Sequence, residues 1–169
     1  MPTIIVEDGS IVENANSYTT VSGVDVYATD YGYTDWTAVS STIKIQSLLR
    51  AMRYIESLSW KGVRSTSDQP LEFPRSDLYD RDGYEVSETT IPLSVIKALC
   101  EVCILCLPNS DVDLQPALNS DNQRKKLIIA DVITEEWQIG RIVREKSTVV
   151  LDLLKGLING SNIVAVERG

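Results

Sequence analysis

The sequence predicts a mainly helical protein, a small bundle of about four helices with a long central loop and minor β elements. Segments with helical spacing of apolar residues flank a stretch, residues 60–91, that is rich in proline, glycine and aspartate. The β-rich runs are short. A chain of 169 residues has room for one domain with a real core. We expect one helical domain over residues 1–160 and a tail over 161–169.

The N-terminal run "TIIVEDGSIV" combines a short β-rich stretch with a turn signal at Asp8-Gly9. It predicts a small hairpin or an extended arm. A short helix over "GVDVYATDY" should follow, with Ser22 as its N-terminal cap and Gly32 as its C-terminal stop.

A longer helix is predicted over "SSTIKIQSLLRAMRYIESL", with Ser40 or Ser41 as the cap. Its apolar residues recur with a helical period: Ile43, Leu48, Leu49, Met52, Ile55 and Leu58. We expect this face to pack against the next helix, which carries the cysteines.

The three cysteines lie in "CEVCILCLP", which has the spacing of the first three positions of a ferredoxin cluster run. The fourth cysteine of such a run precedes a proline, but here Leu107 stands before Pro108, and the chain has no fourth cysteine. In "IPLSVIKALCEVCILCL" the cysteines fall on the apolar side of a helix, with Pro92 suited to its first turn. We therefore interpret Cys100, Cys103 and Cys106 as core residues and not as metal ligands; a redox module is a remote alternative.

After a polar loop, the segment near 126–137 has spacing that fits strand or helix. Its β-branched residues favour strand. "STVVLDLLKGLI" predicts a short helix capped by Ser147 and ended by Asn159-Gly160. The C-terminal tail contains a short strand-like run, residues 163–166.

Composition excludes several classes of function. The net charge is −8, the wrong sign for a protein that gains affinity by neutralising phosphates. The chain has no histidine, which removes the commonest acid-base side chain and metal ligand. No apolar run is long enough to cross a membrane, and we expect a cytosolic protein without catalytic residues, cofactor or metal.

The loop segment "LEFPRSDLYDRDGYEV", residues 71–86, resembles a calcium loop. With Gly83 at the sixth position of an EF-hand loop, Asp80 and Asp82 fit, but Leu78 and Thr89 stand where acidic ligands are required. A turn at "DRDG", with aspartates bonding local backbone and Gly83 at positive φ, explains these residues better.

The order of several motifs resembles a family of small tailed-phage and prophage proteins. The motifs are "VEDGS", "ENANSYTTV", "LLRAMRYIES", "WKGVRS", "LEFPR", "DRDGYEV" and "IPLSVIKALCEVCILCL", covering roughly residues 4–107, with a looser likeness in "VVLDLLKGLI" and "VERG". Members are described as DnaT-like single-stranded-DNA-binding proteins and are similar to head-to-tail connector proteins. Residues 120–146 depart from the family pattern.

The resemblance implies a mainly helical, non-enzymatic adaptor subunit of the virion neck, assembled in the host cytoplasm. Its partners would be the portal protein, a downstream neck or tail-completion protein, and further copies of itself in a twelvefold ring. DNA would only pass through the channel. Twelve copies at −8 each would carry about −96, a charge that favours passage of DNA over its retention.

The alternative is a single-stranded-DNA-binding replication accessory protein. It would need a basic, aromatic-lined groove, and the sequence could gather the charge only from Arg50, Arg53, Lys61 and Arg64. A solvated or inter-subunit charged face explains these four residues equally simply. The aromatic residues at hand are Tyr27, Tyr31, Tyr33, Trp36 and Trp60, for which core or interface packing is the simpler interpretation.

Two segments are candidate partner-binding sites. In the long loop we select Arg75, Asp80, Asp82 and Tyr84, with Arg75 pairing a carboxylate of the loop (Asp77, Asp80 or Asp82) or of a neighbouring subunit. An intramolecular brace onto Trp60 is the alternative role of Arg75.

In the tail we select Ile163, Val164 and Val166, a short apolar strand that could add to another subunit or to the portal. Pairing within its own subunit, with residues 3–6 or 127–133, is the alternative.

Overall fold

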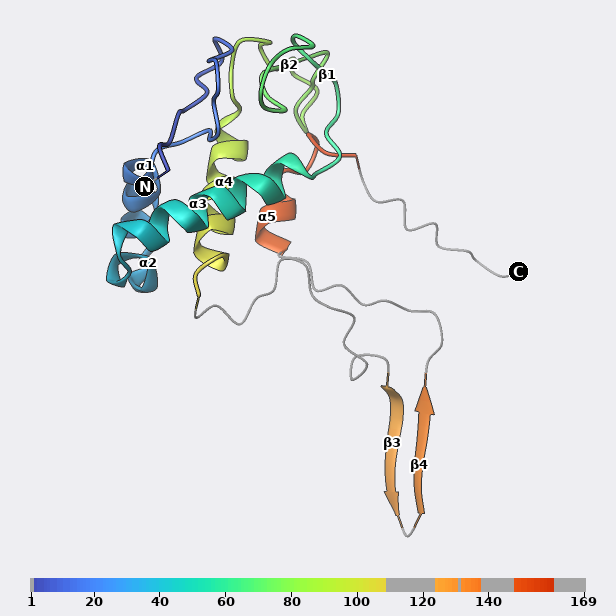
Figure 1. Cartoon of the computed structure of the whole chain (residues 1–169). Coiled ribbons are helices and arrows are strands. Elements are labelled where there is room, and N and C mark those ends of the chain that lie inside the picture. The colour runs from blue at the N-terminus through green and yellow to red at the C-terminus, as the bar shows by residue number, and fades with distance from the viewer. Residues whose placement is uncertain (1, 109–123, 131, 138–147, 160–169) are drawn as a thin grey trace, which may run out of the picture.

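The structure, a computed structural model, describes residues 2–108, 124–130, 132–137 and 148–159. Five helices occur in these ranges: α1 (Val21–Tyr31), α2 (Thr34–Ala38), α3 (Ser41–Glu56), α4 (Leu93–Leu105) and α5 (Thr148–Leu153). The strands are short: β1 (Val63–Arg64), β2 (Arg75–Ser76), β3 (Arg124–Ala130) and β4 (Val132–Trp137). The prediction of a mainly helical fold with minor β elements is confirmed (Figure 1).

Helix α4 is the centre of the core, and α1, α3 and α5 all pack against it (Figure 1). The predicted packing of the long helix α3 on the cysteine-bearing helix is therefore confirmed. Both helices contribute fully buried residues: Leu48, Ala51 and Ile55 from α3, and Val95, Ala98, Leu99, Val102 and Cys103 from α4. None of the helices in the described ranges is long and apolar enough to span a bilayer.

Helix α1 begins two residues earlier than the sequence suggested. Its N-cap is Thr20, whose Oγ1 accepts a hydrogen bond from the backbone N–H of Gly23 at 3.0 Å. The prediction of Ser22 as the cap is wrong, because Ser22 lies within the helix and its side chain is exposed. The predicted stop at Gly32 is confirmed.

The short helix α2 was not predicted, since five residues carry too little periodicity to be recognised. It is held by Trp36, whose side chain is fully buried and whose Nε1 donates to Asp25 of α1 at 2.7 Å. Asp25 also accepts from the Lys44 ammonium at 2.7 Å. Burial opposes ionisation of Asp25, but the hydrogen bonds from Lys44 and Trp36 outweigh it and lower the pKa of this carboxyl.

The N-terminal segment is an extended arm and not a hairpin. Its one bridge joins Val6 and Ser17 in the parallel sense. The turn between them is organised by the buried carboxylate of Glu7, which accepts hydrogen bonds from the backbone N–H groups of Gly9, Ile11 and Val12 at 2.8 to 2.9 Å. Three charge-assisted bonds satisfy a carboxylate that would otherwise be costly to bury.

The predicted strand near residues 126–137 is found as two strands, β3 over residues 124–130 and β4 over residues 132–137. β3 and β4 pair in the antiparallel sense, with Ile129 opposite Ile133 and Leu127 opposite Glu135. The register is irregular between Arg124 and Lys126. The predicted strand-like tail lies outside the described residues.

Helix α5 is shorter than predicted. It ends at Leu153, so the prediction of a stop at Asn159-Gly160 is wrong. The chain turns instead at Gly156, which has a φ of +100° that a side chain would strain. Asn159 then attaches the chain to the end of α3, with its N–H donating to the carbonyl of Ser59 at 2.8 Å.

The three cysteines are free and buried in the core, as predicted. Burial raises the pKa of the Cys100 thiol to about 12 and that of Cys106 to about 11, and raises that of the fully buried Cys103 well above its usual value. All three are therefore protonated thiols that pack as small apolar side chains.

We predict that Cys103→Val keeps the fold and changes the free energy of unfolding by less than about 1.5 kcal/mol, because one small apolar group replaces another. Cys103→Ser, which buries a hydroxyl in the same space, should cost about 1–3 kcal/mol. Chemical denaturation of both variants measures the difference, and elemental analysis reports bound metal. Stoichiometric iron or zinc that disappears in Cys103→Val would contradict the packing role.

Candidate interaction surfaces

The long segment between α3 and α4 is an ordered part of the fold. The prediction of one loop over residues 60–91 holds in that no helix interrupts it, but β1 and β2 pair within it, with Val63 opposite Ser76 and Arg64 opposite Arg75. A smaller hairpin follows, in which Tyr79 bridges Glu85. Phe73 and Leu78 are fully buried and fix the segment to the core.

The Arg75 guanidinium braces this segment from within. The side chain is only 7% exposed. Its Nε donates to the carbonyl of Lys61 at 2.8 Å and its Nη2 to that of Gly62 at 2.9 Å. Its Nη1 donates to both the carbonyl and the carboxylate of Glu72. Arg75 therefore braces the loop within its own chain, but through the carbonyls of Lys61 and Gly62 and not on Trp60, the partner that the alternative named. The carboxylate that pairs with Arg75 is Glu72, and not Asp77, Asp80 or Asp82.

A second brace connects the N-terminal arm, α3 and the long segment. The Tyr18 hydroxyl donates to Glu56 at the end of α3 and accepts from the N–H of Phe73 at 3.0 Å. The other oxygen of Glu56 accepts from the N–H of Glu72 at 2.8 Å. Burial raises the pKa of Glu56, although both hydrogen bonds oppose that shift. Three segments far apart in sequence are thus joined through two polar side chains.

The "DRDG" turn is built as the sequence predicted. Asp80 Oδ1 accepts from the N–H groups of Asp82 and Tyr84, both at 2.9 Å. Gly83 has a φ of +88°, and no calcium-like arrangement is needed to explain the aspartates. The turn presents Tyr84, which is 74% exposed, and the half-exposed Tyr79 belongs to the same small hairpin.

The same turn lies against the chain after α5. A Cβ placed on Gly156 would lie 2.7 Å from the backbone nitrogen of Arg81. Only glycine permits this approach, so the tip of the loop and the end of the described chain support each other. Together Tyr79, Asp80, Arg81, Asp82 and Tyr84 form what we call the loop face.

The structure therefore brings together three of the selected residues, Asp80, Asp82 and Tyr84, on one exposed turn. It separates Arg75 from them, since Arg75 is buried and bonds to Lys61, Gly62 and Glu72 instead. The tail residues Ile163, Val164 and Val166 lie outside the described residues. Binding of a partner by any of these residues stays a prediction.

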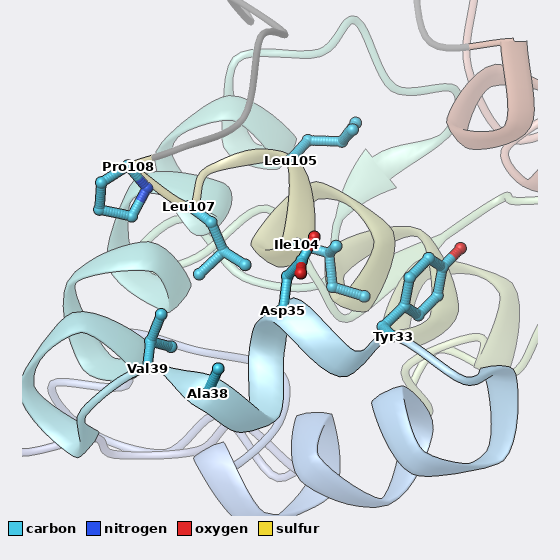
Figure 2. Close-up of a pocket in the computed structure, with 8 residues that line it drawn as sticks. All are labelled: Tyr33, Asp35, Ala38, Val39, Ile104, Leu105, Leu107 and Pro108. Atoms are coloured by element: carbon cyan, nitrogen blue, oxygen red, sulfur yellow. The ribbon is translucent and has the colours of Figure 1, made fainter.

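A different surface, which the sequence did not suggest, lies at the opposite end of α4. An apolar pocket of about 530 Å³ opens there between α2 and the end of α4 (Figure 2). Six of its lining residues are apolar: Ala38, Val39, Ile104, Leu105, Leu107 and Pro108. Tyr33 and the exposed Asp35 supply its polar edge.

One wall of the pocket is held in place by a buried carboxylate. Glu101 of α4 accepts hydrogen bonds from the hydroxyl groups of Tyr27 at 2.7 Å and Tyr33 at 2.9 Å. Burial, followed by the charge and hydrogen bond of Glu101, raises the pKa of both tyrosines, so they remain protonated donors. The ring of Tyr27 stacks on the ring of Tyr31, the last residue of α1, which is 57% exposed. Trp36 and Trp60 are buried in the core, which agrees with the preference for core or interface packing in the sequence analysis.

The four basic residues named for a nucleic-acid groove are all exposed. Arg50 and Arg53 lie on α3, and Lys61 and Arg64 follow it. No ion pair involves any of the four in the described ranges. Over the same ranges, no group of three or more Cys, Asp or Glu side chains is arranged to hold a metal ion.

We predict that Arg75→Met lowers the free energy of unfolding by about 3–5 kcal/mol, because it leaves the Glu72 carboxylate and three carbonyl groups without their buried donor. Arg81→Met is the matched control. The Arg81 side chain is exposed and pairs only with exposed Asp82 at 3.7 Å, so its loss should cost less than about 1 kcal/mol. Equal denaturation midpoints for the two variants would contradict the bracing role.

Comparison with known proteins gives one match. A family model with the description "Putative DnaT-like ssDNA binding protein" matches residues 2–169, nearly the whole chain. Searches of curated proteins and of solved structures found no similar protein.

Proposed function

This chain belongs to the family of DnaT-like single-stranded-DNA-binding proteins, and we propose that it is a structural head-to-tail adaptor in the neck of a tailed-phage virion. In this proposal copies form a twelvefold ring that joins the portal protein to the next neck or tail-completion protein and lets DNA pass. The protein has no enzymatic role and uses no cofactor. It is located in the virion neck, after assembly in the host cytoplasm.

The observation that carries the proposal is the loop face. An exposed turn in a hairpin with two large aromatic side chains is held in a fixed shape by the hydrogen bonds of Asp80 to the N–H groups of Asp82 and Tyr84. Preorganisation of this kind lowers the ordering cost of docking onto another protein, and exposed tyrosines are common anchors at protein interfaces. The loop face is thus suited to a macromolecular partner.

Electrostatics support the same function. A net charge of −8 per chain repels the phosphate backbone, and this repulsion grows when copies gather around a channel. A neck subunit needs DNA to slide through without being retained. An acidic ring meets that requirement better than a basic one.

We predict that Tyr84→Ser lowers co-purification of the portal protein from the same genome by at least about tenfold, since loss of a central aromatic anchor typically costs 2 kcal/mol or more. Val26→Ser is the matched control, because Val26 is 60% exposed on α1, away from the loop face. Both variants should keep the thermal midpoint of the native chain. Undiminished portal binding by Tyr84→Ser would contradict the role of the loop face.

A second arm of the same experiment tests the tail. Deletion of residues 161–169 removes none of the contacts that fix Asn159 to Ser59 and Trp60. The truncated chain should therefore keep its thermal midpoint and lose the portal. A midpoint several degrees lower, or normal portal binding, would contradict the proposed role of Ile163, Val164 and Val166.

The second candidate function is single-stranded-DNA binding, which the description of the family favours. The chain offers one concentrated basic element, and it differs from the four residues chosen from the sequence. β3 begins with Arg124, Lys125 and Lys126, and the register places Arg124 opposite Trp137 of β4. A basic strand next to an aromatic residue is a common arrangement in proteins that bind single strands.

We predict no measurable preference for single-stranded over double-stranded DNA near physiological salt, because a chain of net charge −8 gains little from phosphate contacts. Fluorescence anisotropy with a labelled oligothymidylate tests this. A submicromolar Kd that weakens steeply with salt would favour the second function. Lys125→Glu with Lys126→Glu, compared with Arg50→Glu with Arg53→Glu, would then tell which basic element binds.

A further inference from the structure

We infer that the apolar pocket between α2 and the end of α4 receives the β3–β4 hairpin of a second copy of this chain. The inference rests on the proposed assembly of copies into a ring. It concerns the contact between subunits and not the contact with the portal, which the loop face provides.

The pocket has the properties of a protein-binding site. It is an apolar hollow of about 530 Å³ on the surface, and exposed apolar surface of this kind marks contacts with other proteins. Its walls are formed by apolar side chains from two separate elements, and Figure 2 shows Leu107 and Pro108 facing the α2 side across it. The hydrogen bonds of Glu101 to Tyr27 and Tyr33 keep one wall fixed. An apolar, preformed hollow of this kind favours an apolar occupant.

The α2 side of the pocket is acidic. Residues 2–43, which include α1 and α2, contain six acidic residues and no lysine or arginine. Asp35 at the edge of the pocket is exposed, as is Asp30 at the end of α1. The α4 side differs, because the charge of Arg50 on α3 acts on Cys106 and opposes the rise of its pKa. The part of the occupant that meets α2 should therefore be basic as well as apolar.

The β3–β4 hairpin has this combination. β3 reads "RKKLIIA", three basic residues followed by apolar ones. The register places Ile129 and Ile133 on one face of the hairpin, and Ile128, Ala130 and Val132 on the other. Apolar residues on both faces of a two-stranded sheet require a cover, and such a hairpin is marginally stable alone.

The described part of the chain does not supply that cover. Helices α1 to α5 make at most marginal contact with β3 or β4, whose contacts are almost entirely with each other. In Figure 1 the hairpin lies apart from the helices. Among the described residues, neither the pocket nor the hairpin is covered, and the two surfaces are complementary.

Symmetry favours a second copy as the source of the hairpin. A hairpin on one copy and a pocket on the next are different surfaces, so their contact is heterologous. Heterologous contacts repeat around an axis and close into rings, whereas contacts between identical patches stop at dimers. Head-to-tail docking of this kind is therefore the type of contact that a ring-forming adaptor requires.

Disulfide trapping between two variants, each with one added cysteine, tests the inference. One variant is Ala38→Cys, at the pocket, and the other is Ala130→Cys, at the tip of β3. The native thiols give little background, because all three are buried and have a raised pKa. Mixing the variants under mild oxidation should yield a cross-linked dimer about tenfold more abundant than Ser67→Cys mixed with Ala130→Cys, because docking raises the local thiol concentration.

Charge reversal gives a second readout. Asp35→Lys introduced with Ala38→Cys should reduce the cross-link, and Lys125→Glu introduced with Ala130→Cys should restore it. Restoration would support a direct charge contact across the interface. Reduction by Asp35→Lys without any restoration would argue against this pairing of surfaces.

The outcomes separate this inference from the proposed function. If Ala38→Cys and Ala130→Cys in one chain form only an internal disulfide in a monomer, the hairpin occupies its own pocket and the inference is wrong. If no cross-link forms while the chain still assembles on the portal, the inference is wrong and the adaptor function stands. If the dimer forms but the portal is not bound, the inference stands and the proposed function fails.

Discussion

The fold depends on how the backbone of a long non-helical segment is satisfied where it lies on an apolar core. Carbonyl and N–H groups there must find partners, since each unpaired buried group costs about 1–3 kcal/mol. Arg75 supplies donors to carbonyls of Lys61, Gly62 and Glu72, and Glu56 and Tyr18 accept from N–H groups on the other side. No buried side-chain nitrogen or oxygen in the described ranges lacks a partner. These hydrogen bonds give the non-helical segment a defined conformation on the core.

The molecule has two separate candidate surfaces, the loop face on the long segment and the apolar pocket between α2 and the end of α4. The loop face belongs to the segment that leads into the N-terminal end of α4, and the apolar pocket lies at the C-terminal end of this helix. Helix α3, of 16 residues and therefore about 24 Å long, connects the two regions. A rigid body with distinct surfaces at two ends is suited to a subunit that binds a neighbour in its ring and another protein along the axis.

Charge and family description point in different directions, and the distribution of charge explains how both can apply. The N-terminal 43 residues carry only acidic groups, whereas β3 begins with three basic residues. The average charge of the chain therefore opposes nucleic-acid binding, while one element has the local composition that such binding uses. The same basic element is suited to the acidic surface of a neighbouring copy, so its role depends on which of the two it meets in the assembly.

The sequence by itself determined the features that depend on local chemistry. Periodicity located α3 and α4 and placed the cysteines in the core, and the residue types of the "DRDG" turn predicted its hydrogen bonds and the positive φ of Gly83. Only the tertiary structure decided which distant groups meet. It paired Arg75 with Glu72 and with carbonyls 13 and 14 residues away, joined Tyr18 to Glu56, and formed a pocket from α2 and the end of α4. Such contacts leave no periodic trace in a sequence, because their energy comes from desolvation and geometry between segments that are neighbours only after folding.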